Sequence, residues 1–208
     1  VIEEKGIYSV EKFLMARRLM YWQVYLHKTV ISAEVMLISI LKRARYLARK
    51  GAVIPSSDEL TFFLSTPGDN QNIIGHPDFL RNFVLLDDMD ILWMIKKSVN
   101  HEDFVMKYLC KSLLDRKLLK VMVKSEESHA TYLKAKNEFQ TKSGLNDDET
   151  GYFFSEKKEA IYPYDTRAGE INMLMKNGKI QTYSSLNPNL LTSMEERTFL
   201  FYQRGELN

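Results

Sequence analysis

Apolar residues recur at helical spacing from Val10 to Leu41, and this periodicity constrains the fold more than any other feature of the sequence. Val24 and Val35 keep the spacing, and Gly51 ends it. The pattern predicts one long helix of roughly ten turns. Because this one helix would include about a quarter of the chain, the protein is expected to be mostly α-helical.

Further elements are predicted downstream of this helix. Segment 55–65 is typical of a short N-capped helix after a proline, and the glycine- and proline-containing stretch 66–77 is expected to be a loop. Two more helices are expected around Asp87–Val99 and His101–Asp115. The alternating, branched run from Leu118 to Lys124 indicates a strand.

After Ser125 the pattern changes to one amphipathic helix that ends at Gly144, followed by short β-like runs. The pair Asn177-Gly178 lies between two of these runs and predicts a hairpin with a type I′ turn, in which both central residues have positive φ. The expected fold class is therefore mostly α, with a long-helix bundle at 1–124 followed by a small α+β lobe with a β-hairpin at 125–208.

Composition excludes several classes of protein. The chain has 208 residues, a net charge of +2 and a single cysteine, Cys110, so it has no internal disulfide framework and suits a reducing compartment. Cys110 lies on an apolar helical stripe and is expected to be inert core. No apolar run reaches 18 residues and no signal peptide is evident, which predicts a cytoplasmic protein without a membrane partner.

The predicted long helix carries an unusual combination of charge and aromatic rings. Nine lysines and arginines between Val10 and Lys50 face only two acids, so an anionic partner is expected. On an ideal helical wheel Arg17, Tyr21, Tyr25 and Lys28 share one stripe about 80° wide, and His27 points elsewhere.

Two interpretations of this stripe are open. Arginine and lysine bind phosphate oxygens, and tyrosine can stack on a base or sugar and donate a hydroxyl hydrogen bond, so the stripe has the groups that a nucleotide pocket requires. Aromatic residues on a long helix are also common in cores and interfaces, where arginine stacks on them for structural reasons.

Other constellations predict no catalytic centre in this chain. The run Asp87-Asp88-Met89-Asp90 is interpreted as a helix cap rather than a metal site. The histidines lack metal-ligand spacing, and neither a phosphate-binding glycine loop nor a nucleophile elbow occurs. Trp22 and Trp93 are interpreted as packing anchors. No metal ligands are assigned.

At this point the sequence resembles a known family, the HD-domain phosphohydrolases of the deoxynucleoside-triphosphate triphosphohydrolase type. The resemblance rests on the run from Tyr8 through Phe13 and Arg17 to Tyr25-Leu26-His27-Lys28, and on the segment "LLDRKLLKVMV". It covers about residues 1–124. The family's catalytic histidine, His-Asp doublet and later aspartate cannot be placed here, since no His-Asp pair occurs.

The resemblance implies roles for individual residues. Arg17 matches a residue that contacts substrate phosphates, Tyr25 matches one that lines the sugar and base pocket, and Tyr21 occupies a position near the substrate. Another set matches positions that bind an activating nucleotide at a subunit interface in regulated members: His27, Lys28, Arg116 and Lys120. Gln23 replaces a basic residue of that regulatory site, and Asp115 replaces an aromatic one.

The leading hypothesis is accordingly the C-terminal half of a metal-dependent phosphohydrolase that hydrolyses (deoxy)nucleoside triphosphates when intact. The resemblance implies a divalent metal bound by residues outside this chain, a homo-oligomer (dimer or tetramer), and no hydrolysis by these 208 residues alone. The alternative is a non-enzymatic helical module that binds nucleic acid or a protein partner through the basic helix at 10–50. The second reading predicts affinity for nucleic acid that falls steeply with salt.

Overall fold

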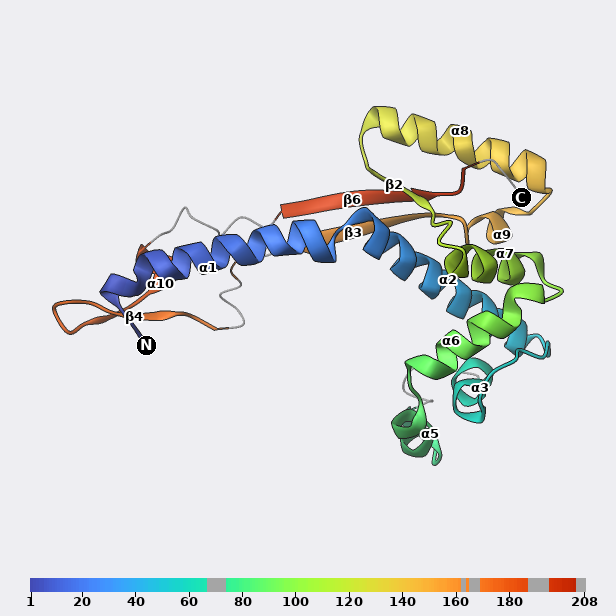
Figure 1. Cartoon of the computed structure of the whole chain (residues 1–208), viewed down its shortest axis with the longest axis horizontal. Helices are drawn as coiled ribbons and strands as arrows, with labels where there is room; N and C mark the ends of the chain where they lie inside the picture. The colour runs from blue at the N-terminus through green and yellow to red at the C-terminus, as the bar shows by residue number, and fades with distance from the viewer. Residues whose placement is uncertain (67–73, 162–163, 165–168, 187–194, 205–208) are drawn as a thin grey trace. The chain divides into compact units, whose positions relative to one another are not determined.

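The computed structural model describes residues 1–66, 74–161, 164, 169–186 and 195–204 (Figure 1). The chain is mostly helical with two small three-stranded sheets, one of which contains a hairpin, so the predicted fold class is confirmed. The strand orders are β1-β4-β5 and β2-β6-β3. Most of the loop predicted at 66–77 lies outside the described residues.

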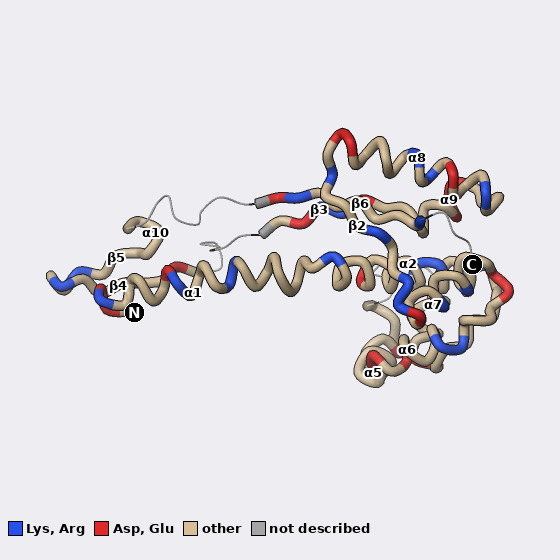
Figure 2. The backbone as a smooth tube through the Cα atoms, turned by 45° about the horizontal axis from the view of Figure 1, so that its top comes forward, with Lys and Arg blue, Asp and Glu red and all other residues tan. Residues whose placement is uncertain are grey.

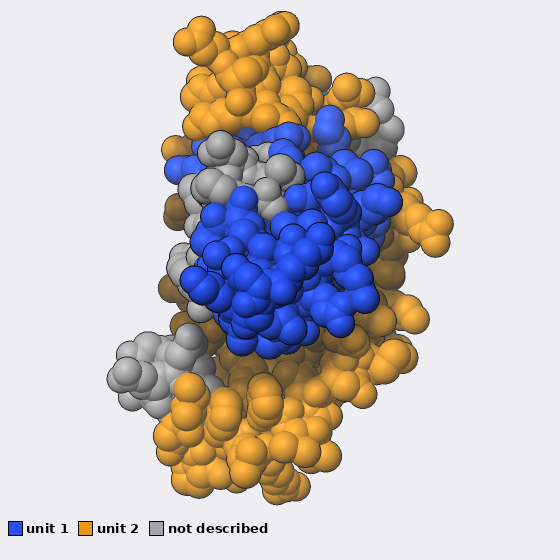
Figure 3. Space-filling view, turned by 90° about the vertical axis from the view of Figure 1, so that its left-hand side faces the viewer, with its two compact units in different colours: residues 1–31, 156–199 blue, residues 32–155, 200–208 orange. Residues whose placement is uncertain are grey.

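The chain forms two compact units, coloured separately in Figure 3. Unit 1 contains Val1–Ile31 and Glu156–Phe199, and unit 2 contains Ser32–Ser155 and Leu200–Asn208. The predicted boundary between a helical region (1–124) and an α+β lobe (125–208) falls inside unit 2. That division into two domains stays a prediction.

The prediction of a single long helix up to Gly51 is wrong, because the helix is broken after its fourth turn. Helix α1 (Ile7–Met20) continues into a π-helical turn, η2 (Tyr21–Tyr25), and helix α2 (Lys28–Arg49) starts afresh. In η2 the Leu26 amide donates to the Tyr21 carbonyl at 2.8 Å, five residues back. Aromatic and β-branched residues in "YWQVY" are weak helix formers, and an extra residue in the turn breaks the helical ladder.

Unit 1 is built from α1 and the hairpin strands β4 (Asn172–Leu174) and β5 (Ile180–Thr182). Its core consists of Val10 and Leu14 of α1 with Met173 and Tyr183, which follow far later in the sequence. The short strand β1 (Ile2–Glu3) pairs in parallel with β4 and was not predicted. A 3-10 turn, η1 (Glu4–Gly6), joins β1 to α1, and helix α10 (Tyr183–Leu186) follows β5.

The hairpin predicted at Asn177-Gly178 is present, but its turn type is different. Only Gly178 has positive φ (78°), whereas a type I′ turn needs positive φ at both central residues. The Gly178 amide donates to the Met175 carbonyl, and the Met175 amide donates to the Lys179 carbonyl, each at 2.9 Å. The connection is therefore a three-residue loop with glycine in the left-handed position. The Asn177 side chain accepts from the Lys179 amide instead.

Unit 2 confirms the helices and the strand that were expected between 55 and 144. Local caps explain several of the boundaries: Ser57 accepts from the Leu60 amide at 3.3 Å, and Gly144 ends α8 with φ 67°. The elements are α3 (Asp58–Ser65), α5 (Phe79–Leu85), α6 (Asp88–Lys97), η3 (Ser98–Asn100), α7 (Phe104–Leu114), β2 (Lys120–Val123), α8 (Glu126–Ser143) and α9 (Asp147–Thr150). Strands β3 (Phe154–Ile161) and β6 (Glu195–Tyr202) contain residues of both units.

A buried arginine connects three elements of unit 2. Arg43 of α2 donates from Nε and Nη2 to the carboxylate of Asp103 at 3.0 and 2.5 Å, and from Nη2 to Glu149 at 3.3 Å. The rings of Tyr46 and Tyr152 lie 5.1 and 5.3 Å from its guanidinium carbon. Burial opposes the charge, but hydrogen bonds and attraction to Asp103 outweigh it, and the pKa of Arg43 is raised.

Cys110 lies fully buried in α7, as expected for inert core. Burial raises the pKa of its thiol to about 12. Because the thiolate is the reactive form, both the burial and the raised pKa of this cysteine disfavour nucleophilic chemistry at neutral pH.

Membrane-spanning potential is limited in the described part of the chain. No single helix there is long and apolar enough to cross a membrane. The two segments on either side of the break, Glu4–Tyr25 and Lys28–Arg49, meet the length and composition criteria only when they are taken together.

Candidate nucleotide-binding face

The three predicted substrate residues form one contact row in unit 1. The Arg17 Nη2 atom donates to the Tyr21 hydroxyl at 3.4 Å, and the guanidinium carbon lies 5.5 Å from the Tyr21 ring centre. The Tyr21 and Tyr25 rings follow, with centres 5.1 Å apart and planes tilted by 46°. Helix α1 provides Arg17 and the π-helical turn provides both tyrosines, so the row runs directly across the change in helical geometry.

The row is accessible to a ligand. Arg17 is exposed, Tyr21 is half-buried and Tyr25 is 53% exposed. One long hydrogen bond to Tyr21 involves one of the five N–H donors of Arg17, and the others suit a bidentate anion. The contact also satisfies the structural interpretation, in which arginine stacks on tyrosine. The geometry is therefore compatible with both interpretations, and the substrate roles of these residues stay predictions.

His27 and Lys28 lie immediately beyond the row, where α2 begins. The Nδ1 atom of His27 accepts from the Thr29 amide at 3.3 Å, so this histidine caps the new helix. Lys28 is exposed at the first position of α2. The ideal wheel that placed Lys28 on the stripe of Arg17 does not apply across the break, since the helical ladder is interrupted between them.

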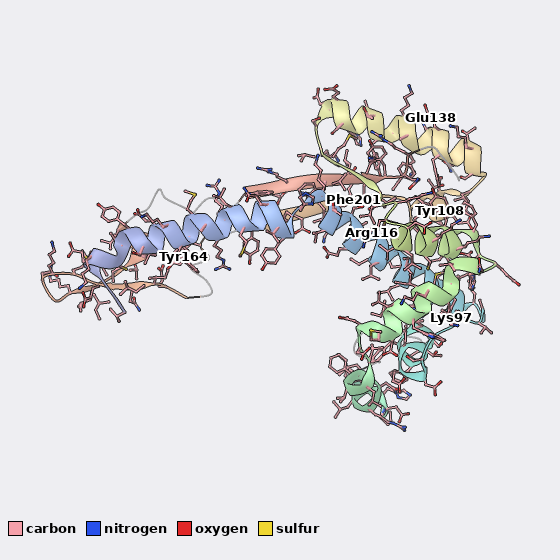
Figure 4. All side chains as sticks on the ribbon, in the orientation of Figure 1. Lys97, Tyr108, Arg116, Glu138, Tyr164 and Phe201 are labelled. Carbon is pink, nitrogen blue, oxygen red and sulfur yellow. The ribbon has the colours of Figure 1, made fainter. Side chains whose placement is uncertain are left out.

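The other two predicted regulatory residues belong to unit 2, and both are exposed. Lys120 begins β2. Arg116 follows α7 with φ 57°, the one non-glycine residue with positive φ in the described ranges. Its amide donates to the Leu113 carbonyl at 3.2 Å, and the Lys117 amide donates to the Ser112 carbonyl at 2.8 Å. This is a Schellman cap with arginine in the position that glycine usually occupies. Figure 4 labels Arg116.

Replacing Arg116 by glycine should raise the free energy of unfolding by about 0.5–1 kcal/mol, because the left-handed conformation costs glycine nothing. Urea unfolding monitored by circular dichroism measures the change. Lys117→Gly is the matched control, since the neighbouring residue has no positive φ and the same substitution there should destabilise the protein. A loss of stability in the Arg116→Gly variant would show that the arginine side chain stabilises the fold, rather than being retained for a ligand.

Metal ligation was not predicted for this chain. Among the residues that the structure describes, no group of three or more His, Cys, Asp or Glu side chains could hold a metal ion. The run at Asp87-Asp88-Met89-Asp90 is a capping box, in which Asp87 accepts from the Met89 amide at 2.7 Å and its own amide donates to Asp90 at 2.9 Å. Hydrogen bonds from the Asp87 amide and from Ser57 lower the pKa of Asp90. The family resemblance implies a divalent metal held by residues outside this chain, and that implication stays a prediction.

The two tryptophans differ in environment. Trp22 is half-buried, with the guanidinium carbon of Arg197 3.7 Å from its ring centre. Trp93 is 46% exposed, with Lys97 Nζ 5.7 Å from its ring centre. The prediction that both are packing anchors agrees better with the half-buried Trp22 than with the more exposed Trp93.

Sequence reasoning missed the ion-pair cluster of Arg43, Asp103 and Glu149. Arg43 is one of the nine lysines and arginines counted between Val10 and Lys50. A signal was present in the sequence, because Arg43 lies between Ile40 and Ala44 on the apolar face of the helix. A charge at a core-facing position implies a buried partner.

No known protein-family model matches the sequence. The chain is 31% identical over 192 residues to the uncharacterized protein YwfO of Bacillus subtilis (strain 168), covering 88% of this chain and 41% of that protein. Among solved structures it is similar to a phosphohydrolase (BT4208) from Bacteroides thetaiotaomicron VPI-5482. That match has a TM-score of 0.85 and 37% identity, and it covers 98% of this chain and 52% of the other.

The chain thus spans about half the length of the phosphohydrolase that it resembles, and less of the curated relative. Nearly all of its 208 residues take part in the structural match. The chain has the fold of about half of a bacterial phosphohydrolase.

Proposed function

We propose that this chain is the nucleotide-binding and oligomerising part of a phosphohydrolase that hydrolyses (deoxy)nucleoside triphosphates. The observation that carries the proposal is the exposed row of Arg17, Tyr21 and Tyr25, which offers a guanidinium for phosphate beside two rings for a sugar or base. The similarity to a solved phosphohydrolase supports the hydrolase class.

The work of this chain in the reaction is binding and charge neutralisation. Arg17 would place its planar fork against phosphate oxygens and stabilise the negative charge that develops on them. Tyr21 holds that fork from one side through its hydroxyl and ring, and Tyr25 extends the aromatic surface. A divalent metal, if the family resemblance holds, would be held by residues outside this chain, so no step of the reaction is assigned to one here.

The burial and contacts of several basic residues of α2 argue against the alternative hypothesis of nucleic-acid binding. Arg43 is buried against Asp103 and Glu149, and Arg49 donates to the Thr66 carbonyl at 3.0 Å. Burial, followed by the charge of Arg49, lowers the pKa of Arg45. Arg43 and Arg45 therefore add little to an open basic face along the helix, which binding to a phosphate backbone requires.

A comparison of two proteins tests the proposal. The full-length protein, incubated with each of the four deoxynucleoside triphosphates and with Mg²⁺ or Mn²⁺, should release either nucleoside together with triphosphate or nucleoside diphosphate together with phosphate. The 208-residue chain alone should bind these nucleotides without hydrolysing them. Hydrolysis by the isolated chain at the rate of the full-length protein would disprove the division of labour. Absence of any nucleotide hydrolysis by the full-length protein would disprove the function.

A further inference from the structure

A widened helical turn lies within the row of Arg17, Tyr21 and Tyr25. The turn is η2, in which the Leu26 amide donates to the Tyr21 carbonyl at 2.8 Å, five residues back. Such π-helical turns are rare, and they are frequently found at functional sites. Because an extra residue interrupts the regular hydrogen bonds of an α-helix, the turn needs support from contacts outside the helix.

The widened turn changes the direction of Tyr25 relative to Arg17. In an uninterrupted α-helix these two residues, eight positions apart, would be separated by about 80° around the axis. One inserted residue turns the residues after it back by up to about 100°, so Tyr25 comes closer to the direction of Arg17. Tyr21 lies about 40° from Arg17 in either case, and it contacts both neighbours. The widening therefore aligns the two ends of the row.

A second contact within unit 1 supports this turn from another side. Trp22 follows Tyr21 and points roughly 100° further around the helix axis. The guanidinium carbon of Arg197, in strand β6, lies 3.7 Å from the Trp22 ring centre, which is a close cation–π contact. The contact joins the widened turn to strand β6 on a side of the helix that differs from the row.

The part of β6 that provides Arg197 is itself held in place. Strand β6 is hydrogen-bonded to β3, and the adjacent residue Glu196 forms an ion pair with Lys158 Nζ of β3 at 3.2 Å. The acidic and basic positions of both strands are coloured in Figure 2. A paired strand is a firmer support for the turn than a loop, because its backbone is fixed by its neighbour.

We propose that Trp22 and Arg197 are positioning residues, which hold the widened turn so that Arg17 and Tyr25 engage one nucleotide together. The inference rests on the proposed function and extends it to two residues outside the row. A nucleoside triphosphate has its charge at one end and its base at the other, so binding requires that guanidinium and ring be in place simultaneously. A turn that is already held in the bound geometry loses less conformational freedom when the ligand binds.

Arg197→Gln in the full-length protein tests the role of the contact, because it removes the cation at an exposed position. For the deoxynucleoside triphosphate that the wild type hydrolyses fastest, kcat/KM should fall roughly three- to tenfold, the change that corresponds to one cation–π contact. Inorganic tripolyphosphate, used as an inhibitor at constant free Mg²⁺, can engage only the arginine end of the row. Its inhibition constant should be unchanged, whereas a general distortion of the site would weaken both ligands.

Further variants separate the contact from its surroundings. Arg197→Lys keeps a cation over the ring and should recover part of the loss. Glu196→Gln is the matched control, because it breaks an exposed ion pair at the adjacent residue and should keep the wild-type kcat/KM. The double variant Trp22→Leu/Arg197→Gln should be no worse than the weaker single variant, since both substitutions remove the same contact. Circular dichroism checks that each variant is folded.

The possible failures of the inference and of the proposed function are distinguishable. If the wild type hydrolyses nucleotide and Arg197→Gln has the same kcat/KM, this inference is overturned and the proposed function is not. Equal weakening of the nucleotide and of tripolyphosphate by Arg197→Gln would also overturn it, because the contact would then support the site as a whole. Absence of hydrolysis by the wild type would overturn the proposed function, and this inference with it.

Discussion

Replacing Arg43 by methionine lowers the free energy of unfolding by about 3–5 kcal/mol, the usual loss when one partner of a buried ion pair is removed. Methionine fills the space of the side-chain stem but leaves the Asp103 carboxylate in a site where its side chain is only 16% exposed. For a chain of this size the loss corresponds to a fall in melting temperature of roughly 10 °C. Thermal and urea unfolding monitored by circular dichroism measure both quantities.

A second substitution distinguishes an uncompensated charge from lost packing. Asp103 also caps α7, where it accepts from the Met106 amide at 2.8 Å, and asparagine can keep that cap. The double variant Arg43→Met/Asp103→Asn should therefore recover a large part of the stability. Arg81→Ala, at an exposed arginine of α5, is the surface control and should change stability by less than about 0.5 kcal/mol. If Arg43→Met resembled that control, the cluster would contribute nothing to folding.

Acid unfolding provides an independent readout of the same cluster. Burial raises the pKa of the Asp103 carboxyl, but hydrogen bonds from Arg43 and the Met106 amide, with nearby positive charge, outweigh burial and hold it below its usual value. The stabilisation is thus present above the unfolded pKa of about 3.9 and is lost as the pH falls through the lower folded pKa. Stability of the Arg43→Met variant should fall less steeply over this acidic range than that of the wild type.

If the proposed function is correct, replacing Arg17 by alanine in the full-length protein should lower kcat/KM for a nucleoside triphosphate by about 10²–10³-fold, the range seen when one group that stabilises developing charge is removed. Arg17→Lys keeps the charge without the planar fork and should fall between alanine and the wild type. Steady-state hydrolysis of a deoxynucleoside triphosphate gives kcat and KM separately. A loss confined to KM would assign Arg17 to ground-state binding alone.

Lys12→Ala is the control for Arg17, because Lys12 is an exposed cation on the same helix outside the row. It should leave kcat/KM within about threefold, as expected for an exposed charge away from the site. Tyr21→Phe removes only the hydroxyl that accepts from Arg17 at 3.4 Å, so its effect should be small. An Arg17→Ala enzyme with the wild-type rate would exclude this residue from the substrate site.

Features that arise from neighbouring residues could be predicted from the sequence. The caps at Ser57 and Asp87 and the glycine stop at Gly144 each depend on a side chain or backbone within a few residues, and all three are observed. The contact of Arg17 with Tyr21, four residues away on one helix, is of the same kind.

Features that depend on distant partners could not be predicted. The pairing of β1 with β4 joins Ile2 to Met173, and the Arg43 cluster joins residues 60 and 106 positions apart. The break at Tyr21–Tyr25 was not predicted for a different reason. The apolar spacing in the sequence does not reveal that one turn is widened by a residue. The unpredicted parts therefore include the geometry that places the two tyrosines of the candidate site.

Unit 1 is built from two segments that are far apart in the sequence, and this affects the order in which the protein folds during synthesis. The apolar face of α1, with Val10 and Leu14, is among the first parts of this chain to be made, whereas its core partner Met173 comes near the end. At translation rates of about 5–20 residues per second, that face stays without its native cover for on the order of ten seconds. Unit 1 must therefore close after most of unit 2 has been synthesised, and the exposed apolar face of its nascent helix favours aggregation during that interval.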